Sequence, residues 1–365
     1  MPVARDGTPS ASALRAGRPA RKRAWPRVSV VMPVRNEARR LRESVGAVLS
    51  QDYAGHLDLT VALAPSDDDT AAVLADLARD RRVRTVDNPS GGTAAGLNAA
   101  IAASTGEVVA RVDGHAVLPP GYLRRAVELL AETGADNVGG IMAAEGQTPF
   151  EQAVAAAMSS RFGTGDARFH YGGPPGAVDT VYLGVFRRSA LGRVGGFDET
   201  LVRTQDSELN LRIRQTGGIV WFSPELQVRY RPRSSVRALI RQYFEYGRWR
   251  RVVARRHRGS LQWRQFVPPV TVLACAVGAA ITATGRRWGL MPLLGYSAGV
   301  LAATVVAGRR LPAGAAVRLP LVFVSMHGAW GVGFLTSPRH LGRGPAGCSQ
   351  YSRHDEQQPD HSERR

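Results

Sequence analysis

The first part of the chain alternates two hydrophobic patterns. Short runs of β-branched residues are followed by longer segments in which apolar residues recur every three or four positions. The runs predict buried strands, and the periodic segments predict helices with one apolar face. We expect strands at residues 28–34, 57–63, 83–86 and 108–112, and helices after the cap residue Asn36 and at residues 70–79 and 91–104. Because strands separated by single helices usually pair in parallel, the pattern predicts an α/β fold with a mostly parallel sheet.

The pattern is looser between residues 113 and 232. It predicts strands at 137–142 and 178–186, a Gly/Pro-rich loop at 163–178, and helices at 120–133, 150–161 and 203–215. We expect this second half of the domain to add a further layer to the strand-and-helix half before it.

The last third contains three apolar runs without internal charges, at residues 267–284, 288–307 and 320–336. Each run is close to the ~17–25 residues that span a bilayer. The third run also holds Ser325 and His327, so we expect two to three transmembrane helices within residues 267–336.

The formal net charge of +18 is concentrated in two short segments. Residues 1–27 carry seven basic residues and one acid, and residues 229–264 carry twelve arginines and one acid. A basic segment beside apolar runs fits a membrane surface, whereas a nucleic-acid groove needs basic residues spread over a folded surface. We therefore expect a membrane partner and no nucleic acid. By the positive-inside rule, the arginines before the first apolar run place the N-terminal domain in the cytoplasm.

Composition also suggests how the ends of the chain are organised. Residues 1–27 read as a disordered basic leader without the apolar core of a secretory signal, and residues 337–365 read as a disordered tail. Residues 233–266 read as a basic amphipathic interface segment. The two cysteines, Cys275 and Cys348, exclude a disulfide framework.

Candidate chemistry follows the first and fourth expected strands, at the edge where such sheets bind ligands. Asn36 and Glu37 open a helix after the first strand, and Asp113 ends the fourth. His115 lies two positions further, so both side chains can reach one divalent cation that neutralises a diphosphate. A helix cap and an Asp-Gly turn explain the same residues structurally.

Two later segments, residues 204–212 and 241–250, each allow a structural and a functional interpretation. Asp206 either caps a helix or acts as a general base that faces the metal site. Glu208 is placed four residues before Arg212, as in a helical ion pair.

In residues 241–250, aromatic residues alternate with arginines, which is typical of an interfacial helix. The functional interpretation is that this segment closes over donor and acceptor with Gln242, Arg248 and Trp249.

Taken in order, five segments resemble family-2 glycosyltransferases of the GT-A fold, in particular membrane-bound bacterial exopolysaccharide enzymes of the succinoglycan-biosynthesis type. The segments are 30–37, 111–115, 195–199, 205–210 and 241–247. The resemblance implies a GT-A domain at residues 28–232 that transfers a sugar from a nucleotide-sugar with inversion. It further implies a divalent cation (Mn²⁺ or Mg²⁺), a lipid-linked or glycan acceptor, and a bacterial-type inner membrane with the catalytic domain facing the cytoplasm.

The resemblance also assigns roles to residues. Asp206 matches the catalytic base, and Asp113 and His115 match the metal-binding pair. The residues that match the nucleotide-sugar site are Pro33, Arg35, Asn36, Glu37, Asn98 and Asp113. The residues that match the acceptor side are Gly195, Gly196, Phe197, Gln205, Glu208, Gln242, Arg248 and Trp249.

One departure from the family pattern concerns the nucleotide base. The acidic pair expected after the second strand falls on Leu63 and Ala64, and acids appear about three positions later. Either Asp67 or Asp68 substitutes, or the base is recognised differently.

Three other functions remain as alternatives. A processive polysaccharide synthase would share the motifs but usually has more spans. A membrane-anchored protein that binds anionic polymers would use the net charge of +18. An inactive scaffold on the same fold is supported only by the missing acids at Leu63 and Ala64.

Overall fold

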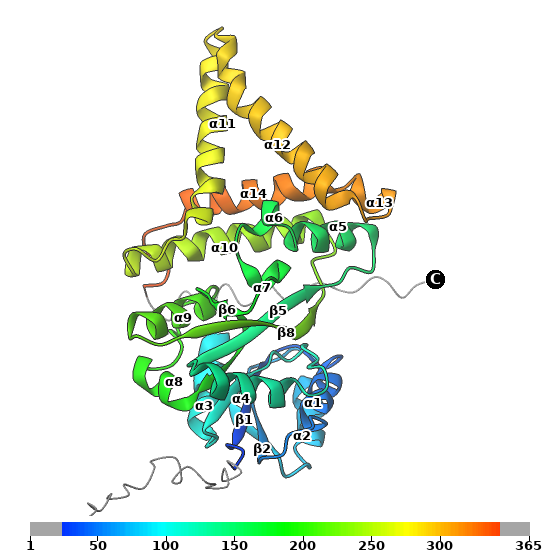
Figure 1. The fold of residues 1–365 in the computed structure, drawn as a ribbon, viewed down its shortest axis with the longest axis vertical. Helices are drawn as coiled ribbons and strands as arrows, with labels where there is room; N and C mark the ends of the chain where they lie inside the picture. The colour runs from blue at the N-terminus through cyan, green and yellow to red at the C-terminus, as the bar shows by residue number, and fades with distance from the viewer. Residues whose placement is uncertain (1–23, 344–365) are drawn as a thin grey trace, which may run out of the picture.

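An eight-stranded sheet organises the first two thirds of the protein, as the computed structural model in Figure 1 shows. The structure describes residues 24–343, so the predictions for most of the basic leader and for the tail beyond residue 343, Cys348 included, lie outside it. The strand order is β3-β2-β1-β4-β7-β5-β8-β6. The strands are β1 (Val28–Val34), β2 (Leu57–Leu63), β3 (Val83–Asp87), β4 (Val108–Arg111), β5 (Asn137–Ala144), β6 (Gly176–Ala177), β7 (Tyr182–Arg187) and β8 (Val220–Tyr230).

The first four strands pair in parallel, as the hydrophobic pattern predicts. β7 then pairs antiparallel with both β4 and β5, and β5 pairs in parallel with β8. The sheet is therefore mixed but mostly parallel, and the carboxyl ends of β1, β2 and β4 meet at one edge.

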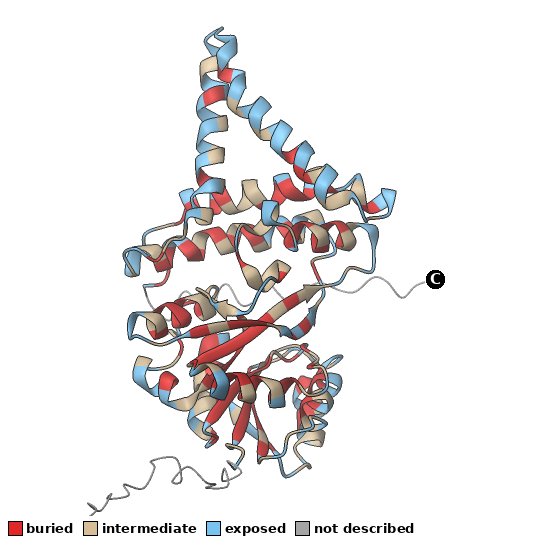
Figure 2. Ribbon diagram, in the orientation of Figure 1, coloured by how far each residue is buried: buried red, intermediate tan, exposed pale blue. Residues whose placement is uncertain are grey.

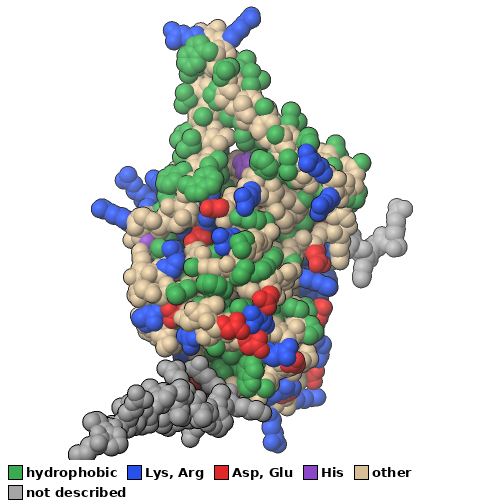
Figure 3. Space-filling view, in the orientation of Figure 1, with side chains coloured by type: hydrophobic (Ala, Val, Ile, Leu, Met, Phe, Trp, Pro, Cys, Tyr) green, Lys and Arg blue, Asp and Glu red, His purple; other side chains and the backbone are tan. Residues whose placement is uncertain are grey.

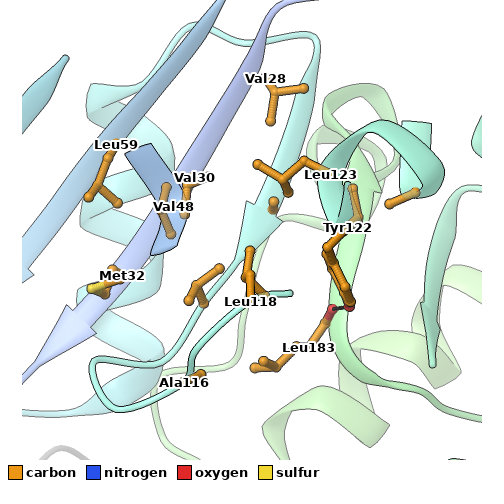
Figure 4. Packing of buried hydrophobic residues seen from close by; sticks show 14 of the residues in the cluster. Val28, Val30, Met32, Val48, Leu59, Ala116, Leu118, Tyr122, Leu123 and Leu183 are labelled. Carbon is orange, nitrogen blue, oxygen red and sulfur yellow. Dashed lines mark hydrogen bonds between the residues drawn. The ribbon is translucent and has the colours of Figure 1, made fainter. Parts of the chain in front are cut away.

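Helices cover both faces of the sheet. The apolar side chains of β1 point alternately to one face and to the other, so each face has a core of its own. Val30 and Met32 face one core and Val31 faces the other. The first core is covered by α1 (Leu41–Leu49), α2 (Thr70–Leu77) and α4 (Tyr122–Thr133). Figure 4 shows its packing around Met32 and Leu59, with the Tyr122 hydroxyl donating to the Leu183 carbonyl at 3.4 Å. The second core is covered by α3 (Thr93–Ala103), α8 (Arg188–Val194) and α9 (Gln205–Gln215).

Local predictions were wrong at three places. Asn36 does not cap α1, which begins at Leu41; Asn36 has a φ of 54° in the turn before it. Asp206 lies in the first turn of α9, so it is not the cap residue either. The expected loop at 163–178 contains part of the short helix α6 (Arg161–Thr164) and the short helix α7 (Arg168–Tyr171).

A helical layer lies above the sheet in Figure 1. It contains α5 (Pro149–Met158) and the long basic helix α10 (Val236–Arg256), followed by the 3-10 turn η1 (Trp263–Gln265). Helices α11 (Val267–Ala283) and α12 (Met291–Gly308) form a projecting hairpin whose tip is η2 (Arg287–Leu290). The chain then returns through α13 (Ala313–Ala316) to α14 (Leu319–Leu335), the last helix of the described residues.

Three helical segments in the described chain are long and apolar enough to cross a membrane: Trp263–Ala283, Arg287–Gly308 and Ala313–Leu335. The first two are 11% buried and the third is 39% buried. Figure 2 shows the hairpin as mainly exposed, and Figure 3 shows hydrophobic side chains along it. The three apolar runs of the sequence are therefore helices in the structure, but the third is buried to a greater extent than the first two.

Candidate active site

The site begins where β4 ends. Arg111 is the last residue of β4, and Asp113 follows two positions later, so the two side chains lie on the same side of the extended chain. The Arg111 guanidinium donates to Asp113 Oδ1 from Nε, at 3.0 Å. Arg111 is only 7% exposed, so this ion pair is fixed within the protein.

The same guanidinium also binds Asp206, the candidate for the catalytic base, on α9. Arg111 donates a hydrogen bond from a terminal nitrogen to Asp206 Oδ1, at the start of α9. The two candidate carboxylates, Asp113 and Asp206, therefore share one arginine. The side chain of Asp206 is 39% exposed, so its carboxylate is accessible from solvent.

Electrostatics sets the two carboxyl groups apart. The surrounding protein desolvates Asp206 and raises its pKa above the ordinary value; the charge of Arg111 opposes this, and Asp113 adds to it. Desolvation also acts to raise the pKa of Asp113, but the charges of Arg111 and His115 outweigh it and hold that pKa below its ordinary value. Two neighbouring acids with opposite pKa shifts are typical of sites in which one group takes a proton and the other stays ionised.

His115 is oriented by Glu37, from the turn after β1. The Nδ1 atom of His115 lies 2.7 Å from Glu37 Oε1. This hydrogen bond raises the pKa of His115 above its ordinary value. Because a carboxylate only accepts, the proton of the neutral ring belongs on Nδ1, and the Nε2 lone pair is left as a possible ligand.

The residues present fit a divalent cation held jointly with a substrate. In residues 24–343, no three His, Cys, Asp or Glu side chains are grouped closely enough to hold a metal by themselves. The chain offers the Asp113 carboxylate and the His115 imidazole, and the Glu37–His115 bond is the pattern that commonly orients a metal-ligating histidine. A diphosphate would have to supply further oxygen ligands.

The residues predicted around the nucleotide base form a second group. The Asn36 side chain accepts from the Asp67 amide at 2.8 Å, and Asp68 accepts from the Ala38 amide at 3.1 Å. Desolvation by the surrounding residues acts to raise the pKa of Asp68, but hydrogen bonds from Thr70 and Ala38 bring it below the ordinary value. An open cavity of about 520 Å³ lies over this loop and is lined by Ala38, Arg39, Ser66, Asp67, Asp68 and Asp69.

Asn98 lies with the expected acceptor loop. Its side chain donates to the Phe197 carbonyl and accepts from the Phe197 amide, both at 2.9 Å. Gly195 and Gly196 precede Phe197 with φ values of 81° and 75°, a backbone that glycine adopts without strain. Asn98 thus fixes a turn, and its predicted contact with the donor stays a prediction.

Glu208 takes part in a buried ion network. It pairs with Arg212 at 2.7 Å, as the i,i+4 spacing predicts, and with His257 Nε2 at 2.9 Å. Arg256 pairs with Asp198 beside it. A cavity of about 350 Å³ lies here, lined by Gly195, Gly196, Phe197, Asp198, Glu208, Arg212, Arg256 and His257. These contacts hold the end of α10 against the turn at Gly195.

The residues predicted to close over the substrates lie along α10. Gln242 donates to the hydroxyl groups of Tyr230 and Tyr246, at 3.0 and 2.9 Å. Arg248 pairs with Glu245 at 3.0 Å. Trp249 is 1% exposed and packs in a cluster with Leu201.

Three further predicted residues lie near the end of β1 or at the start of α9. Pro33 is within β1 and pairs with Ala62 of β2, and Arg35 follows directly after the strand. Gln205 is buried at the first position of α9, next to Asp206.

Arg111 is the main residue of the site to which the motifs assign no role. The alternation of a strand places it on the same side as Asp113, so this signal was present in the sequence. The Glu37–His115 bond joins residues 78 positions apart, which no local pattern reveals.

Comparison with known proteins places this site in a family. Residues 29–195 match the model of Glycosyl transferase family 2. The succinoglycan biosynthesis protein ExoA of Rhizobium meliloti (strain 1021) is 30% identical over 314 residues, which cover 84% of this chain and 93% of ExoA. A pre-mycofactocin glycosyltransferase of Mycobacterium tuberculosis (strain ATCC 25618 / H37Rv) is 28% identical over 290 residues, 78% of this chain and 57% of that protein.

A solved structure has a similar fold. The mannosyltransferase PcManGT from Pyrobaculum calidifontis, in complex with GDP-Man and Mn²⁺, aligns with a TM-score of 0.57 and 22% sequence identity. The alignment covers 85% of this chain and 87% of that chain. The GT-A arrangement expected from the motifs is therefore confirmed.

Proposed function

The chain belongs to glycosyl transferase family 2, and from this premise we propose that it transfers one sugar from a nucleotide-sugar to a glycan hydroxyl, with inversion at the anomeric carbon. The observation that carries this proposal is the shared ion pair of Arg111 with Asp113 and Asp206. It brings a donor-side carboxylate and an acceptor-side carboxylate together at one edge of the sheet.

Asp206 acts as the general base in this proposal. It accepts the proton of the acceptor hydroxyl while that oxygen attacks the anomeric carbon and the bond to the diphosphate breaks. A raised pKa makes Asp206 a better proton acceptor than an ordinary surface carboxylate. A single displacement reverses the anomeric configuration.

Asp113 and His115 bind the donor side. With its pKa held low, Asp113 stays ionised at neutral pH and would hold a divalent cation together with His115. Mn²⁺ or Mg²⁺ bound there would supply positive charge to the leaving diphosphate. We propose that Asp67 and the adjacent cavity receive the nucleotide base, which the shifted acids of this loop make possible.

We also propose that the protein works at a membrane on a lipid-linked glycan, in exopolysaccharide or cell-envelope synthesis. The three apolar helical segments and the basic helix α10 support membrane attachment. The name of ExoA, a succinoglycan biosynthesis protein, supports the class of product. The arginines of residues 248–264 support a catalytic domain on the cytoplasmic side of a bacterial inner membrane.

The test is nucleotide release by membranes that contain the protein. A panel of nucleotide-sugars is supplied with Mn²⁺ or Mg²⁺ and a lipid extract as the source of acceptors. The proposal expects release with one donor, dependent on the extract, and addition of a single sugar per acceptor. A ladder of products would favour a processive synthase, and no release with any donor or extract would contradict the proposal.

A further inference from the structure

Helix α14 has the composition of a membrane span but not the surroundings of one. The 39% buried fraction of its segment contrasts with 11% for each of the other two candidate segments. We infer that α14 lies flat in the membrane surface, and that only the α11–α12 hairpin crosses the lipid. The inference rests on the membrane attachment proposed above.

The first argument is the triangle formed by α11, α12 and α14 in Figure 1. A Cβ placed on Gly331 of α14 would lie 2.7 Å from the carbonyl oxygen of Pro268, at the start of α11. A Cβ on Gly308, the last residue of α12, would lie 3.3 Å from Leu319, the first residue of α14. Thus α14 runs from one foot of the hairpin to the other.

Both feet are attached to the catalytic domain. At the first foot, Arg264 pairs with Asp166 and with Asp179. At the second foot, α13 packs against α5. Two feet on the same domain lie on the same side of a bilayer, so the helix that joins them lies along its surface.

The second argument is the partner of α14, which is the charged helix α10. A Cβ on Gly247 of α10 would collide with the Trp330 carbonyl, and a Cβ on Gly333 would collide with the Phe244 carbonyl. Further along, Arg251 stacks 4.9 Å from the centre of the Phe334 ring. The backbones of the two helices therefore touch where residues 244–247 of α10 meet residues 330–333 of α14.

A crossing orientation of this helix pair would carry α10 into the lipid. Placing an arginine at the centre of a bilayer costs about 2.5–3.5 kcal/mol on insertion scales. The arginines of α10 are Arg237, Arg241, Arg248, Arg250, Arg251, Arg255 and Arg256. A surface orientation keeps these charges out of the acyl core of the bilayer.

The third argument is the division of α14 into two faces. One face packs on the catalytic domain with Phe323 and Met326, and His327 donates from Nε2 to the Phe162 carbonyl at 2.8 Å. The opposite face is an exposed apolar stripe formed by Leu321, Val324, Val332 and Leu335, each 40–51% exposed. Because α14 joins the two feet of the apolar hairpin, we take the acyl layer next to the headgroups as the partner of this stripe.

The hairpin alone has the dimensions of a crossing element. Its helices α11 and α12 have 17 and 18 residues, or about 25 and 27 Å, at the lower end of the ~17–25 residues that span a bilayer. Its tip carries the exposed Arg286, Arg287 and Trp288, polar and aromatic residues that are suited to a membrane–water interface and not to the acyl core. Figure 3 shows basic side chains at this tip.

Immersion depth tests the inference directly. Nitroxide labels are attached at Val324→Cys and Val332→Cys, after replacement of Cys275 and Cys348, and their depth in proteoliposomes is measured from oxygen and nickel-chelate relaxation. These positions are about 12 Å apart along α14. We expect equal depths for a flat helix, and depths that differ by about 12 Å would overturn the inference. The matched pair Val270→Cys and Val277→Cys on α11, about 10 Å apart, should differ in depth.

Sidedness gives an independent test. Single cysteines at Ala131 in the catalytic domain, Arg287 at the tip and His340 after α14 are labelled with an impermeant maleimide in vesicles of known orientation. We expect Ala131→Cys and His340→Cys to react from one side and Arg287→Cys from the other. Reaction of His340→Cys from the side opposite Ala131→Cys, or of all three from one side, would overturn the inference.

The controls separate this inference from the proposed function. Release of the protein from vesicles by alkaline carbonate would overturn membrane attachment and the inference with it. Absence of glycosyl transfer in vesicles that show the expected depths and sidedness would count only against the proposed function.

Discussion

The guanidinium of Arg111 is hydrogen-bonded to the carboxylate of Asp206, 95 positions further along the chain. Because Arg111 is buried and also binds Asp113, it fixes the distance between the two carboxylates on which the proposed chemistry depends. It also supplies the positive charge that keeps the pKa of Asp206 from rising further.

Replacement of Arg111 should change the pH dependence of transfer. The base must be ionised, so activity falls as the pH drops through the pKa of Asp206. Loss of the Arg111 charge raises that pKa, so in Arg111→Gln the acidic limb of the rate profile should move to higher pH. The measurement is kcat/KM against pH for wild type and variant. An unmoved limb would show that Arg111 does not set the ionisation of the base.

Replacement of Glu37 should weaken metal binding through His115. We expect Glu37→Gln to lower Mn²⁺ affinity about 10–100-fold, the usual effect of removing such an orienting partner. Since Glu37 raises the pKa of His115, the pH midpoint of Mn²⁺ binding should also fall in the variant. Electron paramagnetic resonance of free Mn²⁺ measures both quantities. Glu43→Gln, an exposed acid on α1, is the matched control, and an equal effect there would refute the assignment.

Gly247 should be intolerant of a side chain. Because a Cβ there collides with the backbone of Trp330, we expect Gly247→Ala to destabilise the protein by about 1–3 kcal/mol. Gly46→Ala, in α1 with no atom within 4 Å of the new Cβ, should be neutral or stabilising by about 0.5–1 kcal/mol. Thermal unfolding in detergent compares the two, and equal stability would contradict the close packing of α10 on α14.

Trp249 should matter for packing more than for contact with the acceptor. It is almost fully buried with Leu201, on the loop that leads to Asp206. Trp249→Ala should cost about 3–5 kcal/mol of stability. Trp249→Phe should keep the KM for the acceptor close to that of wild type. A large increase in this KM without a loss of stability would restore the role predicted from the motif.

The sequence predicted those parts of the fold that depend on local pattern. β1, β2 and β4 were predictable because each is a short buried run of apolar residues. β3 was predictable from its valines, although only Val83 is buried there. β8 was missed because Pro224 and Glu225 interrupt its alternation. The structure accommodates them where the pairing register shifts, between Gly139 paired with Phe222 and Ile141 paired with Gln227.

The orientation of α14 and the pairing of residues far apart in the sequence could not be predicted from local pattern. The apolar run of α14 looks like a span, because length and composition are the same for a crossing helix and a flat one. Its position follows only from contacts such as that between Gly331 and Pro268. The sequence analysis named the two acids Asp113 and Asp206 as candidates, but it did not name Arg111, the arginine that joins them.

The most direct test of the central claim, that Asp206 is the base of an inverting transfer, is to measure transfer and donor binding together for Asp206→Asn. Wild-type membranes and Asp113→Ala membranes serve as references. We predict that Asp206→Asn binds the nucleotide-sugar like wild type but transfers the sugar about 10²–10⁴-fold more slowly. Asp113→Ala should instead lose donor and metal binding. Transfer by Asp206→Asn at the wild-type rate would contradict the claim.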